Sequence, residues 1–222
     1  MKLHKDQKIL KNILNKYINK NENILDVGCG VGRNLKLLRS LNYKKIYGTD
    51  ISVDMINISK KEGLNVFLPE DIRSNQKQFD VLIFSHVLEH VNEDCIQKFL
   101  EEYFRLLKDN GKIIILTPVL YDAFFNDIDH VKPYYPNGLI RLFSDEFVSK
   151  KYKSSFNLLL EDIYFRKSSL LPYNLRSRYI KKIRYKIMFA FLEYLFLALQ
   201  ILSLGVLSKT TGYGAYFLLK KK

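Results

Sequence analysis

The sequence predicts an α/β fold in which a mostly parallel sheet is flanked by helices. Short apolar segments alternate with amphipathic segments as far as Pro118, and a glycine-rich loop joins the first of these strands to the next helix. The hydrophobic content of 47% is typical of a globular chain, and 222 residues suit one domain. We therefore expect a single domain over residues 1–222.

The expected elements alternate regularly along the chain. Helices are expected where apolar residues recur at helical spacing, at Ile9–Ile18, Arg33–Leu41, Asp54–Glu62, Glu93–Lys108 and Leu139–Lys150. Strands are expected at Ile24–Val27, Lys45–Gly48, Asn65–Leu68, Val81–Phe84, Lys112–Leu116, Leu158–Phe165 and Tyr213–Leu219. Asn110-Gly111 predicts a turn just before the fifth strand. The segment Val119–Asn137 predicts a long loop of the kind that binds substrates.

The strongest functional signal is the run Asp26-Val27-Gly28-Cys29-Gly30-Val31-Gly32 after the first strand. Its glycines let the backbone turn sharply and approach a ligand, although a tight turn alone would also explain them. The spacing is GxGxG, whereas the dinucleotide fingerprint is GxGxxG with pyrophosphate at the helix start. Asp26 would repel pyrophosphate and suits a positively charged cofactor such as S-adenosylmethionine (SAM). We therefore favour SAM over NAD.

Two further acids follow later strands. Asp50 lies 18 residues beyond Gly32, where an acid can accept hydrogen bonds from ribose hydroxyls. Its alternative role is to cap the following helix, as Ser52 could also do. Asp71, in Pro69-Glu70-Asp71-Ile72, could accept a hydrogen bond from an adenine amine, or it could simply be a solvated loop acid.

These residues together resemble the class I SAM-dependent methyltransferase family over roughly Ile24 to Pro118. The similarity includes the fourth-strand segment Phe79–His90 and the passage Arg105–Lys112 into the fifth strand. It implies a Rossmann-like sheet of seven strands whose last strand is antiparallel. It also implies which residues surround SAM: Gly28, Gly30 and Gly32 near the methionine part, Asp50 on the ribose, and Asp71 with Ile72 at the adenine. Ile51, Ser85 and His86 are further expected cofactor-binding residues.

His86, Glu89 and His90 form an HxxEH pattern, which on a helix can bind zinc. The segment resembles ubiquinone-biosynthesis O-methyltransferases, in which an ExxEH pattern can hold a divalent metal. This chain has His86 in place of the first Glu, so we predict no metal. We expect His86 to contact cofactor or substrate, and Glu89 and His90 to cap and orient the following helix.

His130 is the candidate catalytic residue. Its segment, Asp129–Tyr134, looks like the loop after strand five in methyltransferases that act on sugars or glycolipids. Methyl transfer to a hydroxyl needs the proton removed near neutral pH, and the pKa of histidine suits that task. The alternative is that His130 makes only a polar contact in the loop.

The positive charge is concentrated in the last third of the chain. The net charge is +13, and Lys150–Lys222 contains 15 Lys and Arg against 3 Asp and Glu. Six basic residues in Arg176–Lys186 precede the apolar run Ile187–Val206. We expect residues 172–208 to form a helical insertion before the last strand, with 176–206 at an anionic membrane surface. A buried helix, a homodimer face and, less favoured, a membrane span are the alternatives.

The sequence thus predicts a SAM-dependent O-methyltransferase with a small-molecule, sugar, glycolipid or quinone-type acceptor, lipid-linked in some of these cases. We expect a cytoplasmic protein at the inner face of the membrane, because Cys29 and Cys95 form no CxxC pair and no apolar run of signal-peptide length begins the chain. The basic tail also suggests RNA methylation, but nucleic acid is disfavoured because no RNA-binding module is present. A non-catalytic docking protein with a SAM fold is the other alternative.

Overall fold

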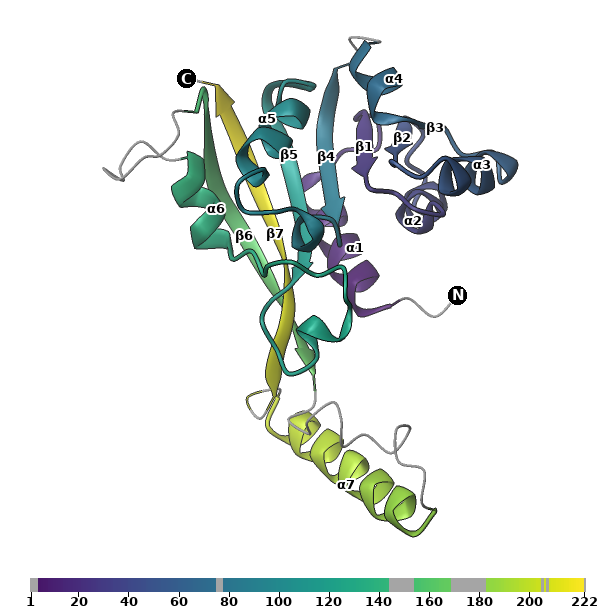
Figure 1. Ribbon diagram of the computed structural model, residues 1–222, viewed down its shortest axis with the longest axis vertical. Helices are drawn as coiled ribbons and strands as arrows, with labels where there is room; N and C mark the ends of the chain where they lie inside the picture. The colour runs from purple at the N-terminus through teal and green to yellow at the C-terminus, as the bar shows by residue number, and fades with distance from the viewer. Residues whose placement is uncertain are drawn as a thin grey trace.

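The computed structural model describes residues 4–74, 78–143, 154–168, 183–204, 206 and 208–221. Its centre is a seven-stranded sheet with the strand order β3-β2-β1-β4-β5-β7-β6. Helices lie on both faces of this sheet, and one long helix extends from its far end (Figure 1). The predicted seven-stranded α/β sheet is therefore confirmed.

The strands are β1 (Ile24–Val27), β2 (Ile46–Thr49), β3 (Val66–Phe67), β4 (Phe79–Ser85), β5 (Leu107–Pro118), β6 (Phe156–Ser168) and β7 (Lys209–Lys221). The α-helices are α1 (Lys5–Tyr17), α2 (Arg33–Ser40), α3 (Val53–Lys61), α4 (Pro69–Ser74), α5 (Ile96–Phe104), α6 (Pro136–Phe143) and α7 (Ile183–Leu202). Two short 3-10 helices are η1 (Leu88–His90) and η2 (Phe124–Asn126). Each expected strand overlaps an observed one, and residues 144–150 of the expected helix Leu139–Lys150 lie outside the described residues.

Three local predictions are wrong. The segment after β3, in which the sequence allows Asp71 to be a loop acid, is the short helix α4, which begins with a proline whose fixed φ suits the first helical turn. The helix predicted over Glu93–Lys108 covers only Ile96–Phe104. Asn110 has a left-handed φ of 56°, yet β5 continues through it, and the pairing with β4 shifts register at Phe79/Val81. Asn110-Gly111 therefore belongs to an irregularity inside the strand and does not mark its start.

The strand pairing places the functional loops at the carboxyl end of the parallel strands. Strands β1 to β5 pair in parallel, whereas β7 is antiparallel to both β5 and β6. All four residues of β1 are buried, as expected for a central parallel strand covered on both faces. Successive residues such as Ile24 and Leu25 point to opposite faces of the sheet and enter different core clusters. The carboxyl ends of β1, β2 and β4 consequently meet beneath the glycine loop.

In the chain, helix α7 follows β6 and precedes β7. Ser168, the last residue of β6, pairs with Lys209, the first residue of β7, so the insertion begins and ends at the same point of the sheet. Figure 1 shows α7 extending from that point, away from the sheet. Of the predicted insertion 172–208, the residues before Ile183 lie outside the described part of the chain.

Candidate functional site

The glycine loop between β1 and α2 turns on three left-handed glycines, Gly28, Gly30 and Gly32, with φ values of 67°, 51° and 73°. A Cβ on Gly28 would collide with Val87, and a Cβ on Gly32 would collide with Leu64. A Cβ on Gly30 would meet nothing within 4 Å. Packing within the protein therefore explains two of the glycines, while Gly30 borders open space.

That space is the first of three neighbouring cavities, with a volume of about 460 Å³. Its lining includes Gly28, Gly30, Asn34, Met55, Ser85 and His86. The second cavity, of about 330 Å³, is lined by Thr49, Asp50, Ile51, Pro69, His86 and Val87 among others. The third, of about 550 Å³, is lined by Tyr121, Asn126, Ile128, His130, Arg166 and, again, His86. His86 thus stands where all three cavities meet.

Asp26 is buried in β1 with one carboxylate oxygen lacking a partner. Its Oδ1 accepts a hydrogen bond from Asn34 Nδ2 at 3.3 Å, whereas Oδ2 has no hydrogen-bond partner among the described residues. Burial raises the pKa of Asp26 to about 7. Asp26 does not itself line a cavity, but Asn34 lines the first. A buried carboxylate oxygen without a partner is costly, and a cationic ligand group would remove that cost.

Asp50 holds the glycine loop in place. Its Oδ2 accepts a hydrogen bond from the Gly30 N–H at 2.8 Å, and its Oδ1 accepts one from the Ser52 N–H at 2.9 Å. The cap of α3 is Ser52, whose Oγ accepts from the Met55 N–H at 3.4 Å. Each carboxylate oxygen can accept a second hydrogen bond, so the ribose role of Asp50 stays a prediction. Its neighbour Ile51 is 86% exposed at the same cavity.

The residues predicted at the adenine are divided by α4. Ile72 is buried in the hydrophobic core, and Asp71 is exposed. Neither lines any of the three cavities, whereas Pro69 at the start of the same helix lines the second. The adenine contact of Asp71 and Ile72 therefore stays a prediction, and Pro69 is the residue that the fold brings to the cavity.

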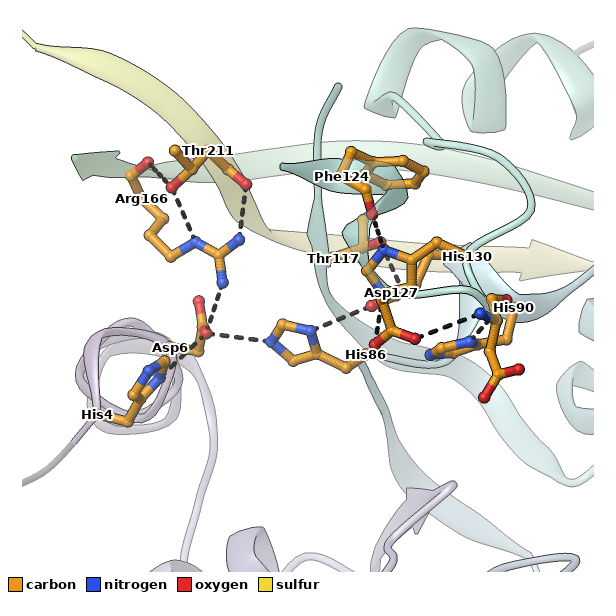
Figure 2. A network of polar contacts seen from close by, with 12 residues as sticks. His4, Asp6, His86, His90, Thr117, Phe124, Asp127, His130, Arg166 and Thr211 are labelled. Atoms are coloured by element: carbon orange, nitrogen blue, oxygen red, sulfur yellow. Dashed lines mark hydrogen bonds and ion pairs between the residues drawn. The ribbon is translucent and has the colours of Figure 1, made fainter. Parts of the chain in front are cut away.

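A charged network surrounds His86 (Figure 2). Its Nε2 lies 3.1 Å from Asp6 Oδ2, and its Nδ1 lies 3.1 Å from Glu89 Oε1. Arg166 Nη1 donates to the same Asp6 oxygen at 2.8 Å, and Thr117 Oγ1 donates to Glu89 Oε2 at 2.9 Å. Burial lowers the pKa of His86, but the two carboxylates outweigh it and raise that pKa to about 9. His86 is consequently an imidazolium at neutral pH and cannot accept a proton there.

The predicted capping role of Glu89 and His90 is wrong. Glu89 is fully buried against His86 and Thr117, and α5 begins only at Ile96, after Cys95. Residues Leu88–His90 form η1, which turns the chain back toward the loop after β5. There the His90 Nδ1 lies 3.0 Å from the Asp129 carbonyl oxygen, so this segment positions the loop.

His130 lies in that loop with one ring nitrogen occupied. Its Nδ1 lies 2.8 Å from the Phe124 carbonyl oxygen, and a carbonyl can only accept, so Nδ1 carries the proton. In the neutral ring the other nitrogen, Nε2, holds the lone pair, and it lies 3.6 Å from Asp127 Oδ2. The ring stands 5.0 Å from that of His90. This tautomer suits a base that accepts a proton through Nε2.

The same region contains a group of potential metal ligands. Glu89, His90 and His130 each offer one atom, and these atoms lie within 4.8 Å of one another. Glu89 is already paired with His86 and Thr117, and both histidines use Nδ1 on backbone carbonyl groups. The prediction that this protein needs no metal stays a prediction.

Two residues of the network have no local signal in the sequence. Asp6 is 80 positions before His86, and Arg166 is a further 80 positions after it. In the sequence, Asp6 is simply the one acid of the lysine-rich segment Lys5–Tyr17. The structure shows that this acid is buried, with 7% of its surface exposed. The fold brings both residues to the end of β4.

The family model described as a methyltransferase domain matches residues 3–161. A ubiquinone biosynthesis O-methyltransferase of Pelagibacter ubique is 34% identical over 106 residues, which is 44% of this chain and 42% of that one. A ubiquinone/menaquinone biosynthesis C-methyltransferase of Campylobacter jejuni is 28% identical over 120 residues, or 50% of each chain. The chain spans about half the length, or less, of these curated relatives.

The solved structure of a SAM-dependent methyltransferase from Archaeoglobus fulgidus has the same fold, with a TM-score of 0.58 at 22% identity. That likeness covers 96% of this chain and 94% of the other. The family match ends at residue 161, so α7 and β7 lie outside it.

Proposed function

Since this chain belongs to the SAM-dependent methyltransferase family and takes SAM as its cofactor, we propose that it methylates a hydroxyl oxygen of a small molecule bound in the third cavity. The observation that carries this proposal is the position of His130. It lines the third cavity, which shares His86 with the two cavities beside the glycine loop, and its Nδ1 is held by the Phe124 carbonyl.

The residues of the first two cavities fit SAM. The open side of Gly30 suits the methionine part, whose ammonium group would stabilise the buried Asp26 carboxylate by charge attraction, while Asn34, the residue that donates to Asp26, lines the cavity. Asp50 and the exposed Ile51 suit the ribose and the adenine in the second cavity. Gly28 and His86 line both cavities, so the two cavities adjoin and one ligand can occupy both.

Bound SAM supplies the methyl group as an electrophilic carbon on sulfur. His130 Nε2 accepts the proton of the acceptor hydroxyl, which increases the negative charge on the attacking oxygen. With SAM held beside the glycine loop, that oxygen would bond to the methyl carbon as the carbon–sulfur bond broke, and the electron pair would stay on sulfur. Positioning the oxygen in line with that bond can lower the barrier by up to about 7–11 kcal/mol. A general base contributes roughly 10²–10⁴-fold in rate, equal to about 3–5 kcal/mol, so positioning is the larger effect.

A base beside the acceptor favours an oxygen nucleophile. The two named relatives act in quinone biosynthesis, one on oxygen and the other on carbon, so they leave the acceptor atom open. The third cavity has aromatic, polar and apolar lining residues, including Tyr121, Asn126 and Ile128. We propose a sugar, glycolipid or quinone-type alcohol or phenol as the acceptor, reached from the cytosolic side of a membrane.

The test is methyl transfer by the full chain with labelled SAM and a panel of catechols, quinone precursors and glycolipids. His130→Ala should lower kcat by roughly 10²–10⁴-fold with the Kd for SAM unchanged. Val131→Ala, in the same loop but lining none of the three cavities, is the matched control and should keep most of kcat. Near-normal turnover by His130→Ala, or methylation confined to carbon acceptors, would refute the proposal.

A further inference from the structure

Helix α7 carries an exposed apolar face. At 3.6 residues per turn, Ile187, Phe191, Tyr194 and Ile201 fall on one side of the helix. Their side chains are 65%, 68%, 73% and 65% exposed. Glu193 and Gln200 lie seven residues apart on a different side, which is half-buried. The exposed side is therefore apolar, the reverse of a helix on the surface of a globular domain, and half-buried Phe189, Leu192 and Phe196 make the opposite side largely apolar as well.

The loop between β5 and α6 adds exposed apolar residues at the same end of the sheet (Figure 1). Leu120, Phe125 and Ile128 are 55%, 63% and 94% exposed. The loop is tied to the base of the α7 insertion, because Lys209 Nζ donates to Asp122 Oδ1 at 2.6 Å. Ile128 also lines the third cavity, so the mouth of that cavity lies beside these exposed residues.

Charge indicates what covers this surface. Six basic residues lie between Arg176 and Lys186, and the sequence has no acid between Asp162 and Glu193. Each basic residue near an anionic membrane strengthens binding by roughly fivefold. We propose that the exposed sides of α7 and of the Leu120–Ile128 loop together form a docking surface for an anionic lipid bilayer. On this surface the third cavity would receive a lipid-anchored acceptor, a step that rests on the proposed function.

A single membrane crossing does not fit the topology. Residues Tyr185–Leu202 have the length and composition of a crossing helix. However, Ser168 and Lys209 pair in the sheet, so both ends of the insertion lie on one side of any membrane. The stretch 169–182, which contains four basic residues, would have to cross back through hydrocarbon, where charges are disfavoured. The helix therefore lies in the interface, with its apolar side toward the acyl chains.

The experiment is flotation of the full chain with phosphatidylcholine vesicles, with and without phosphatidylglycerol, at low and high salt. Wild-type protein should float with the anionic vesicles and partly detach at high salt. The double variant Phe191→Asp/Tyr194→Asp should bind at least tenfold more weakly, because burying one large apolar side chain contributes about tenfold or more. Ile128→Asp should weaken binding in the same direction.

The matched control is Ile58→Asp, an exposed apolar residue on α3 that is 44% accessible and belongs to neither α7 nor the loop. It should float like wild type, and circular dichroism should show that all variants are folded. Wild-type protein that ignores every vesicle, variants that float unchanged, or a dimer that dissociates only when α7 is altered would overturn the proposal. Calorimetric binding of SAM, measured separately, distinguishes its failure from failure of the proposed function.

Discussion

Replacement of Gly30 by alanine tests whether the open space beside the glycine loop is the cofactor site. Within the described part of the chain, the added Cβ meets no atom within 4 Å, so there is room for it. At a φ of 51° a non-glycine residue costs about 1–2 kcal/mol, which for a chain of this size lowers Tm by roughly 2–8 °C. A methyl group forced into a filled ligand site costs about 1–3 kcal/mol more, equal to roughly 5–150-fold in the Kd for SAM.

Gly63→Ala separates these two effects. Gly63 has a similar φ of 68° and also meets nothing within 4 Å, but it lines none of the three cavities. Both variants should therefore lose similar stability in thermal unfolding, while only Gly30→Ala should lose SAM affinity in isothermal titration calorimetry. If the two variants bind SAM equally well, the space beside Gly30 does not hold the cofactor.

The remaining predictions concern charge. Only the ionised carboxylate of Asp26 attracts an ammonium, so SAM affinity should fall about tenfold for each pH unit below the Asp26 pKa of about 7. Calorimetry should show this slope in wild type and none in Asp26→Asn. The pKa of His86 is raised above that of the unfolded state, so its contribution to stability is complete below about pH 6.5 and is lost as pH rises through about 9. Urea unfolding between those pH values should show this loss, and Asp6→Asn should reduce it; an unchanged slope would mean that the Asp6–His86 pair contributes little.

Much of the fold and the cofactor site can be predicted from the sequence, because their chemistry is local. The glycine loop needs three left-handed residues within five positions, and only glycine adopts that conformation without strain. Strands β4 and β5 contain the continuous apolar runs Val81–Phe84 and Ile113–Leu116, because central parallel strands are covered on both faces. The boundaries that failed, at α4, α5 and Asn110, are those where a weak local preference competes with pairing or packing from elsewhere in the chain.

Tertiary structure alone decided the charge state and the surroundings of His86. The HxxEH pattern gives no sign that Asp6 and Arg166 lie beside it, because the attraction between charges depends on distance in space and those residues are far away in the chain. The pattern therefore suggested helix capping, whereas the fold forms a buried charged network between three cavities.

The same distinction holds for the tail. Its sequence determined that 176–206 is basic and then apolar, since composition is a property of the chain by itself. Which side of α7 is exposed depends on how the helix sits against the rest of the protein. The pairing of Ser168 with Lys209 returns the chain to the sheet, and that pairing fixes both ends of the insertion at one point. The sequence thus determined the cofactor loop, and the fold decided what lies around it.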